Sequence, residues 1–287
     1  MTRLDCAGRS LDLGRVAVMG ILNVTSDSFS DGGLFLSAGR AIDHAHRMVE
    51  EGADIIDIGG ESTRPGANPV SVQGELERVV PVIEALRKAI DIPISIDTSK
   101  PTVMREAVRA GAGLINDVMA LRDEGALQTA AELGVPVCLM HMQGEPRTMQ
   151  DNPHYDDVVQ DVWGFLRARI AACSTAGISR ERIIIDPGFG FGKTLEHNLD
   201  LLRNLHEFKR LGTPILVGLS RKSMIGKALD LPLERRLHAS VALAVLAALN
   251  GASLVRVHDV AATREALNMV EAAYPAEMAV HIQRRGH

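Results

Sequence analysis

Eight short runs of apolar, mostly β-branched residues recur along the chain, and most are separated by segments long enough for a helix. The runs cover residues 16–22, 54–58, 94–96, 113–115, 135–140, 183–185, 215–217 and 254–257. Continuous apolar runs are typical of strands buried on both faces of a parallel sheet. The intervening segments with a period near 3.6 residues are 38–51, 73–90, 103–110, 126–133, 156–176, 198–211 and 237–250. Strand–helix alternation repeated eight times predicts an α/β fold, a single closed (β/α)8 TIM barrel, with an open doubly wound sheet as the alternative.

The length and composition favour one domain over two. The chain has 287 residues, of which 46% are hydrophobic and 23% charged, as in ordinary soluble proteins. A single barrel takes about 250 residues, and no Pro/Ser-rich linker or change in composition divides this chain. We therefore expect one domain over residues 1–287, with a core of about 15–275, a short N-terminal lead-in and a frayed C-terminal tail.

Charge and hydropathy argue against a nucleic-acid or membrane partner. The formal net charge is −5 and the pI is about 6.1, so no overall positive field attracts a nucleic acid. The longest apolar stretch, 241–249, is shorter than the roughly 20 residues that span a bilayer. The cysteines Cys6, Cys138 and Cys173 are widely spaced, which favours a reducing, cytoplasmic compartment over a disulfide framework.

Polar or charged residues stand at the C-terminal end of every predicted strand. In chain order they include Asn23, Asp57, Asp97, Asn116, His141, Asp186, Lys222, Arg256 and His258. In a (β/α)8 barrel the carboxyl ends of all the strands lie on one face, where active sites are built. Because all eight strands deliver such groups, the pattern predicts an enzyme with its site at this face rather than an inert scaffold.

Asp57, Asp97, Asn116 and Asp186 form the acidic and amide part of this pattern. Buried carboxylates need partners, because an unpaired buried charge is costly. They could cap helices or pair with a barrel arginine. They could also accept hydrogen bonds from a flat heterocycle that is rich in N–H groups, which is the interpretation we favour for Asp97, Asn116 and Asp186 together.

Arg64, Lys222, Arg256 and His258 are cationic or can become so, although the chain as a whole is acidic. They could form salt bridges to the same aspartates, or they could bind a phosphate or diphosphate. Asn23 is a neutral oxygen ligand of the kind that Mg²⁺ accepts beside substrate phosphates.

A glycine-rich segment at 188–194, GFGFGKT, resembles a phosphate-binding P-loop only superficially. The first glycine of that motif is replaced by Pro187, so we reject the P-loop hypothesis. The glycines would instead let the backbone approach a flat ligand, on which Phe189 or Phe191 could stack. A Schiff-base role for Lys222 is a further alternative, which its place beside Arg221 disfavours.

Eight motifs coincide with the predicted strand ends. They are MGILNVTSDSFSDGG at 19–33, DIGGESTRPG at 57–66, SIDTSK at 95–100, IND at 115–117, LMHM at 139–142, DPGFGFGK at 186–193, SRKS at 220–223 and RVHD at 256–259. In this order, over about residues 15–272, they resemble the dihydropteroate synthase family of folate biosynthesis, whose members are pterin-binding TIM barrels.

The resemblance implies a cytoplasmic transferase that is a homodimer, with helices near 237–250 and 263–273 as candidate interfaces. It implies joining 6-hydroxymethyl-7,8-dihydropterin diphosphate to 4-aminobenzoate, giving 7,8-dihydropteroate and diphosphate, with Mg²⁺ as cofactor. We expect an SN1-like displacement, in which the ring stabilises the cation left by the departing diphosphate. A non-catalytic pterin-binding paralogue on the same barrel is the alternative.

The resemblance also implies the residues of each subsite. The pterin site would comprise Asp97, Asn116, Met140, Asp186, Phe191, Gly218 and Lys222. The aminobenzoate site would comprise Phe29, Thr63, Arg64, Pro65, Lys222 and Ser223. The diphosphate site would comprise Asn23, Thr63, Arg64, Arg256 and His258, with Asn23 also the metal ligand. Catalytic roles would fall to Asp57, Asp97, Lys222, Arg256 and His258.

One position departs from the family pattern. The first loop usually has Pro after Asn-Val-Thr, and this chain has Ser26. Proline stiffens a loop, so Ser26 could raise the KM for 4-aminobenzoate and change the response to sulfonamides, which mimic that substrate. The alternative is a neutral substitution at a tolerant loop tip.

Overall fold

The computed structural model describes residues 3–24, 33–62, 69–144 and 148–274, with the side chains of 33–38 excepted. Five residues singled out by the sequence fall outside these ranges. They are Ser26, Phe29, Thr63, Arg64 and Pro65. The predictions made for them therefore stay predictions.

Eight parallel strands form the barrel. They are β3 (Ala17–Asn23), β4 (Ile55–Gly59), β5 (Ile94–Asp97), β6 (Leu114–Asp117), β7 (Val137–Met140), β8 (Ile183–Asp186), β9 (Leu216–Val217) and β10 (Leu254–Val257). Their spatial order is β8-β7-β6-β5-β4-β3-β10-β9. The ring closes where Ile185 N–H of β8 donates to the Pro214 carbonyl over 3.0 Å, beside a parallel bridge to Ile215. Closure confirms the barrel and excludes the open sheet.

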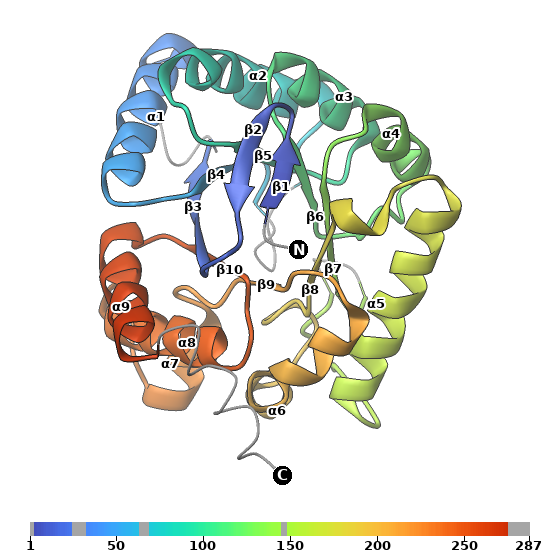
Figure 1. The fold of residues 1–287 in the computed structure, drawn as a ribbon, viewed down its shortest axis with the longest axis vertical. Helices are drawn as coiled ribbons and strands as arrows, with labels where there is room; N and C mark the ends of the chain where they lie inside the picture. The colour runs from blue at the N-terminus through green and yellow to red at the C-terminus, as the bar shows by residue number, and fades with distance from the viewer. Residues whose placement is uncertain (1–2, 25–32, 63–68, 145–147, 275–287) are drawn as a thin grey trace.

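Helices surround the strands on the outside (Figure 1). The described helices are α1 (Gly33–Glu50), α2 (Val72–Ala89), α3 (Pro101–Ala110), α4 (Ala126–Leu133), α5 (Val158–Thr175), α6 (Leu195–Arg203), α7 (Ser223–Leu229), α8 (Leu237–Leu249) and α9 (Val260–Ala273). No helix in the described part is both long and apolar enough to cross a membrane.

The helix expected over 198–211 is in fact two pieces, α6 and a 3₁₀ helix at Leu205–Leu211. Asn204 marks the break, with its backbone and side-chain N–H groups both bonded to the Asp200 carbonyl, at 3.0 and 2.9 Å. That local side-chain bond competes with continuation of the helix, so the chain tightens at Asn204. A periodic apolar pattern does not reveal such a break.

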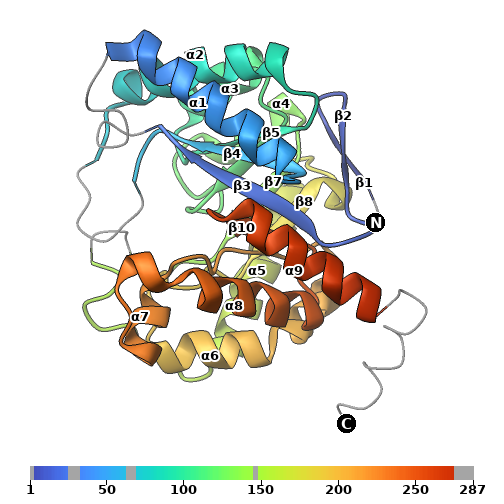
Figure 2. The same ribbon diagram turned by 90° about the vertical axis from the view of Figure 1, so that its left-hand side faces the viewer.

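A short hairpin fills the N-terminal end of the barrel. Strands β1 (Arg3–Cys6) and β2 (Arg9–Asp12) pair antiparallel with Leu4 opposite Leu11, and they lie beyond the start of β3 in Figure 2. Leu4, Cys6 and Leu11 are buried among inward-facing residues at the strand starts. Those residues are Ala17, Met19, Ile55, Leu114, Cys138, Ile184, Leu216 and Leu254. The short N-terminal lead-in expected from the sequence includes this hairpin at residues 3–12, whose side chains complete the inner core.

Replacing Leu11 by alanine tests the hairpin's contribution to stability. Leu11 is 1% exposed inside the barrel, so Leu11→Ala leaves a cavity. We expect the free energy of unfolding in urea to fall by roughly 2–5 kcal/mol. Val72→Ala, at a side chain that is 39% exposed, is the control and should change it by under about 0.5 kcal/mol. Equal effects of the two substitutions would exclude the hairpin from the cooperative core.

Candidate active site

Carboxylates from neighbouring strands meet at the C-terminal face of the barrel. Asp57 lies in β4, Asp97 ends β5 and Asn116 lies near the end of β6. Asp97 and Asn116 are paired across the β5–β6 ladder, so the register itself sets them side by side. Asp186 ends β8 opposite Met140 of β7 in the same way. Parallel pairing therefore gathers residues that are far apart in the sequence.

Arg256 of β10 joins two of these carboxylates. Its Nε donates to Asp57 Oδ2 over 2.6 Å, and its Nη2 donates to Asp97 Oδ2 over 2.7 Å. Asn116 Nδ2 donates to the same Asp57 oxygen over 3.1 Å. The sequence left open whether Arg256 pairs with the aspartates or binds an anion. The structure shows the two ion pairs, while 21% of the Arg256 side chain stays exposed.

Burial sets the electrostatics of this cluster. It raises the pKa of Asp97 to about 7, against the attraction of Arg256 and with a smaller contribution from Asp57. It also raises the pKa of Asp186 to about 6, although Gly188 N–H donates to Asp186 Oδ1 over 2.7 Å and opposes the rise. Both carboxyl groups therefore change charge near neutral pH, as groups in functional clefts often do.

Lys222 and Phe191 meet on the other side of the face. Lys222 Nζ lies 4.2 Å from the centroid of the Phe191 ring, within the range of a cation–π contact. Burial lowers the pKa of Lys222 to about 8, and the charge of Asp186 opposes that fall. Phe191 packs with Met140, Met142 and Met149, so an apolar floor lies below the ammonium group.

Phe189 and Phe191, the two residues of the glycine-rich segment that were predicted to stack on a ligand, lie in different environments. Phe191 belongs to this apolar floor, whereas Phe189 is 1% exposed and belongs to the main core. Phe189 is therefore wrong as a stacking residue. A side-chain carbon added at Gly218, after β9, would meet no atom within 4 Å, so the predicted pterin site has open space there.

His258 is held in place by Ser220, which follows β9. Ser220 Oγ and His258 Nδ1 lie 3.0 Å apart, and the His258 backbone N–H donates to Ser220 Oγ over 3.2 Å. Next to them, Arg221 forms a two-pronged ion pair with Asp259, at 2.9 and 2.5 Å. The SRKS and RVHD motifs are thus tied together, which places Lys222 and His258 on adjacent strand ends. The sequence offered no signal for the Arg221–Asp259 pair beyond the presence of both residues.

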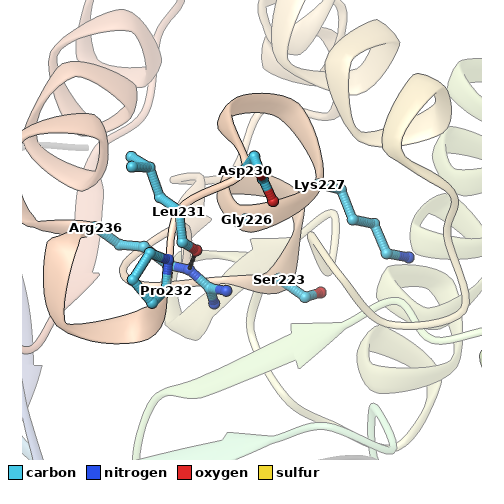
Figure 3. A pocket seen from close by; sticks show the side chains of 7 residues that line it. All are labelled: Ser223, Gly226, Lys227, Asp230, Leu231, Pro232 and Arg236. Atoms are coloured by element: carbon cyan, nitrogen blue, oxygen red, sulfur yellow. Dashed lines mark hydrogen bonds between the residues drawn. The ribbon is translucent and has the colours of Figure 1, made fainter.

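Ser223 begins α7 and borders a separate surface hollow of about 520 Å³ (Figure 3). The residues around it are Ser223, Gly226, Lys227, Asp230, Leu231, Pro232 and Arg236. Arg236 Nε donates to the Leu231 carbonyl over 3.1 Å, a hydrogen bond that joins two residues lining this hollow. None of Asp57, Asp97 and Asp186 lines this hollow, so the carboxylate cluster lies outside it.

Asn23 ends β3 beside the same cluster. It pairs in register with Gly59, and a carbon added at Gly59 would lie 3.6 Å from Asn23 Oδ1 and 3.8 Å from Asp97 Oδ2. An amide oxygen suits Mg²⁺, which keeps several waters and substrate phosphates as its other ligands. In the described ranges no group of three or more His, Cys, Asp or Glu side chains could hold a metal ion. The Asn23 amide oxygen is chemically suited to be one ligand of Mg²⁺.

A lysine that the sequence did not single out anchors the start of the loop after β4. Lys100, after β5, forms ion pairs with Glu61 and with the buried Glu75. Glu61 Oε1 also accepts a hydrogen bond from Val70 N–H over 2.9 Å. These contacts join residues 61 and 70, the two sides of a segment that includes three predicted substrate-binding residues. Sequence separations of 39 and 25 residues conceal such pairs.

The raised pKa of Asp186 predicts how stability depends on pH. The pKa of Asp186 is about 6 in the folded protein against an ordinary value of 3.8. Between these two pH values the folded state therefore binds more protons than the unfolded state. The free energy of unfolding therefore falls as pH rises through this window. Asp186→Asn removes this loss. Above pH 6 we expect the free energy of unfolding of the variant to exceed that of the parent protein by on the order of 2 kcal/mol, with no gain near pH 4.

Urea unfolding of Asp186→Asn at pH 4 and pH 8 measures this difference. Asp156→Asn is the control, because the Asp156 side chain is fully exposed. Its free energy of unfolding should differ from that of the parent protein by the same amount at pH 4 and at pH 8. A variant less stable than the parent at pH 8 would show that the buried carboxylate stabilises the fold.

Comparison with known proteins agrees with this geometry. Residues 19–258 match the family described as "Pterin binding enzyme". The dihydropteroate synthase of Escherichia coli K12 is 54% identical over 275 residues, which is 96% of this chain and 98% of the relative.

Solved structures give the same result at the level of the fold. A Xanthomonas albilineans dihydropteroate synthase with 4-aminobenzoic acid has a TM-score of 0.91 and 55% identity, covering 96% of this chain and 99% of that one. The same relative has been solved with 7,8-dihydropteroate. A Yersinia pestis dihydropteroate synthase with a sulfonamide drug has a TM-score of 0.91 and 54% identity, covering 96% and 100%. This chain belongs to the dihydropteroate synthase family of pterin-binding enzymes.

Proposed function

We propose that this protein is a dihydropteroate synthase, a transferase of folate biosynthesis. It would join 6-hydroxymethyl-7,8-dihydropterin diphosphate to 4-aminobenzoate and release diphosphate. The observation that carries the proposal is the cluster of Asp57, Asp97, Asn116 and Arg256 at one barrel mouth, in a chain 54% identical to a synthase over 96% of its length. The inference of a heterocycle site from the strand ends leads to the same substrate.

The pterin would lie against the β5–β8 side of the mouth. Asp97, Asn116 and Asp186 offer carboxylate and amide groups to its N–H-rich edge, since buried polar groups on both partners need hydrogen bonds. Met140 and Phe191 supply an apolar surface for its flat face. Lys222 lies across the Phe191 ring, so it can donate to an acceptor atom of a ring bound between them.

The reaction would begin with cleavage of the bond between the pterin methylene carbon and the diphosphate oxygen. The electron pair leaves with diphosphate, and the remaining cation is delocalised over the pterin ring. The carboxylates of Asp57 and Asp97 favour positive charge nearby. The amine lone pair of 4-aminobenzoate then attacks the methylene carbon, and the amine loses a proton to solvent.

Departing diphosphate needs cationic or donor groups. Arg256 and His258 are the described candidates, together with Asn23, and Thr63 and Arg64 are predicted from the family. Bound Mg²⁺, held by Asn23 and the substrate, would offset the negative charge of the leaving group. The aminobenzoate subsite would use Lys222 and Ser223 with Phe29, Thr63, Arg64 and Pro65.

The same proposal extends to assembly and compartment. Helix α8 has no Asp, Glu, Lys or Arg, and its Leu246 and Leu249 are 47% and 43% exposed. On the neighbouring α9, Met269 is 65% exposed. A helix that is apolar all round is normally covered on both sides, so α8 and α9 would form a homodimer interface. The free, buried Cys6, Cys138 and Cys173 support a reducing, cytoplasmic compartment.

The first test is diphosphate release from purified protein with Mg²⁺, the pterin diphosphate and 4-aminobenzoate, omitting each in turn. We expect release only when the aromatic amine is present, with dihydropteroate as product. Borohydride added during turnover should leave Lys222 unmodified, because no Schiff base forms. Tight pterin binding without release would instead identify a non-catalytic pterin-binding protein.

Assembly is tested by sedimentation of the Leu246→Arg variant. The charge would be buried in the proposed interface, so we expect the parent to sediment as a dimer and the variant mainly as a monomer. Val72→Arg, at an exposed position of α2, is the matched control and should remain dimeric. A monomeric parent protein would refute this part of the proposal.

A further inference from the structure

A buried lysine closes the segment between β8 and α6. Lys193 is 2% exposed, and its Nζ has three acceptors around it. They are His141 Nδ1 at 2.9 Å, the Gly188 carbonyl at 2.9 Å and the Phe191 carbonyl at 3.0 Å. An ammonium group carries three N–H donors, so these acceptors can satisfy it completely. The side chain thus folds back onto the segment from which it comes.

His141 fixes the direction of this contact. Where Lys193 carries its ammonium charge it can only donate, so His141 Nδ1 accepts and the ring proton sits on Nε2. Burial lowers the pKa of Lys193 to about 7, and the charge of Asp186 opposes that fall. Burial lowers the pKa of His141 to about 2, with a further contribution from Lys193, and the ring is neutral at physiological pH. His141 follows β7, so the bond links the end of one strand to the loop after the next.

Other contacts hold the same segment. Gly190 N–H donates to Asn198 Oδ1 over 2.7 Å, and Tyr155 Oη donates to the Gly192 carbonyl over 2.8 Å. At Gly188, with φ +69°, a side-chain carbon would collide with the His141 carbonyl oxygen. The segment therefore rests directly on the backbone after β7, and only glycine permits that approach.

Two groups of the proposed pterin site depend on this segment. Gly188 N–H donates to Asp186 Oδ1, and the Phe191 ring lies beneath the Lys222 ammonium. Lys193 bonds the carbonyls of both Gly188 and Phe191. Its ammonium therefore fixes the spacing between the carboxylate at one end of the segment and the ring at the other.

We propose that Lys193 is a positioning residue, paired with His141, that sets the Asp186 carboxylate and the Phe191 ring for pterin recognition. The proposal rests on the proposed synthase function. Lys193 does not act as a phosphate-binding lysine despite its Gly-Lys-Thr context, because all three contacts of its Nζ are to His141 and to its own segment.

The aminobenzoate side of the site is held by different residues. Arg221 N–H donates to Ser240 Oγ over 2.9 Å, and Arg236 Nη1 donates to the Arg221 carbonyl over 3.2 Å. With the Arg221–Asp259 ion pair, these contacts fix Lys222 and Ser223 from α8 and β10. Loss of Lys193 should therefore affect the two substrates unequally.

The experiment compares Lys193→Met with Lys209→Met in the full-length protein. Methionine keeps most of the side-chain length but removes the ammonium, so His141 Nδ1 and the Phe191 carbonyl lose this donor. The Gly188 carbonyl also loses it but keeps its bond from Phe191 N–H over 3.2 Å. We expect Lys193→Met to raise the KM and Kd for the pterin diphosphate by roughly 10-fold or more, with the KM for 4-aminobenzoate changed less than about twofold. Lys209, a lysine of the 3₁₀ helix before β9 that packs near Gly251, is the control and should change neither.

A second pair of variants tests the partner and guards against misfolding of Lys193→Met. In His141→Asn the side-chain oxygen can still accept from Lys193, whereas His141→Leu removes the acceptor. We expect His141→Leu to weaken pterin binding selectively and His141→Asn to restore most of it. Equal behaviour of these two variants, an unchanged pterin KM and Kd in Lys193→Met, or an equal shift for both substrates would overturn the proposal.

Calorimetric titration with the pterin diphosphate alone supplies the Kd without turnover. If the parent protein binds it but releases no diphosphate, the proposed function fails while the positioning role is still decided by the Kd of the variants. If the parent turns over normally and the variants show no selective loss, only the positioning role fails.

Discussion

The site depends on one guanidinium group that balances crowded carboxylates. Arg256 bonds Asp57 and Asp97 at the same time, and Asn116 completes the coordination of Asp57 Oδ2. Without a cation there, two carboxylates on adjacent strands would repel one another in a poorly solvated place. Even so, the pKa of Asp97 is raised to about 7 because burial outweighs the attraction of Arg256. The buried carboxylates of this cluster suit a ligand that carries N–H donors and a developing positive charge.

The other end of the barrel is apolar and well packed. The hairpin strands β1 and β2 insert Leu4, Cys6 and Leu11 among the strand starts, so the inner core is apolar where the site is not. Arg9 also donates to the Ile92 and Arg87 carbonyls, at 2.8 and 2.6 Å, which ties the hairpin to the C-terminal end of α2. The apolar inner core and the charged cluster therefore occupy opposite ends of the same barrel.

The strand ends were predictable because parallel pairing maps sequence order onto one face. Asp97, Asn116 and Asp186 could be named from their positions after apolar runs alone, and Asp57 from its position within one. The hairpin could not, since RLDC and RSLD are too short and too polar to stand out as strands. The glycine-rich run by itself could not choose between Phe189 and Phe191; the family resemblance named Phe191, and packing separates the two. The sequence predicted Arg256 as a site residue, but its two ion pairs span 199 and 159 residues and have no local signature.

The segment at 188–194 shows why a motif must be judged by where its groups point. Gly-Lys-Thr before a helix is the setting of a phosphate-binding lysine, in which the Thr hydroxyl binds Mg²⁺. In this chain the Thr194 hydroxyl instead caps α6. Here the three alternating glycines take positive φ, and two carbonyls of the curled segment, those of Gly188 and Phe191, accept hydrogen bonds from Lys193. The Lys193 side-chain nitrogen is fully hydrogen-bonded within the protein, whereas Lys222 faces the Phe191 ring. The two lysines thus act on the same aromatic ring in different ways. Lys193 fixes the backbone that carries Phe191, and Lys222 lies over the Phe191 ring, where it can contact a bound heterocycle.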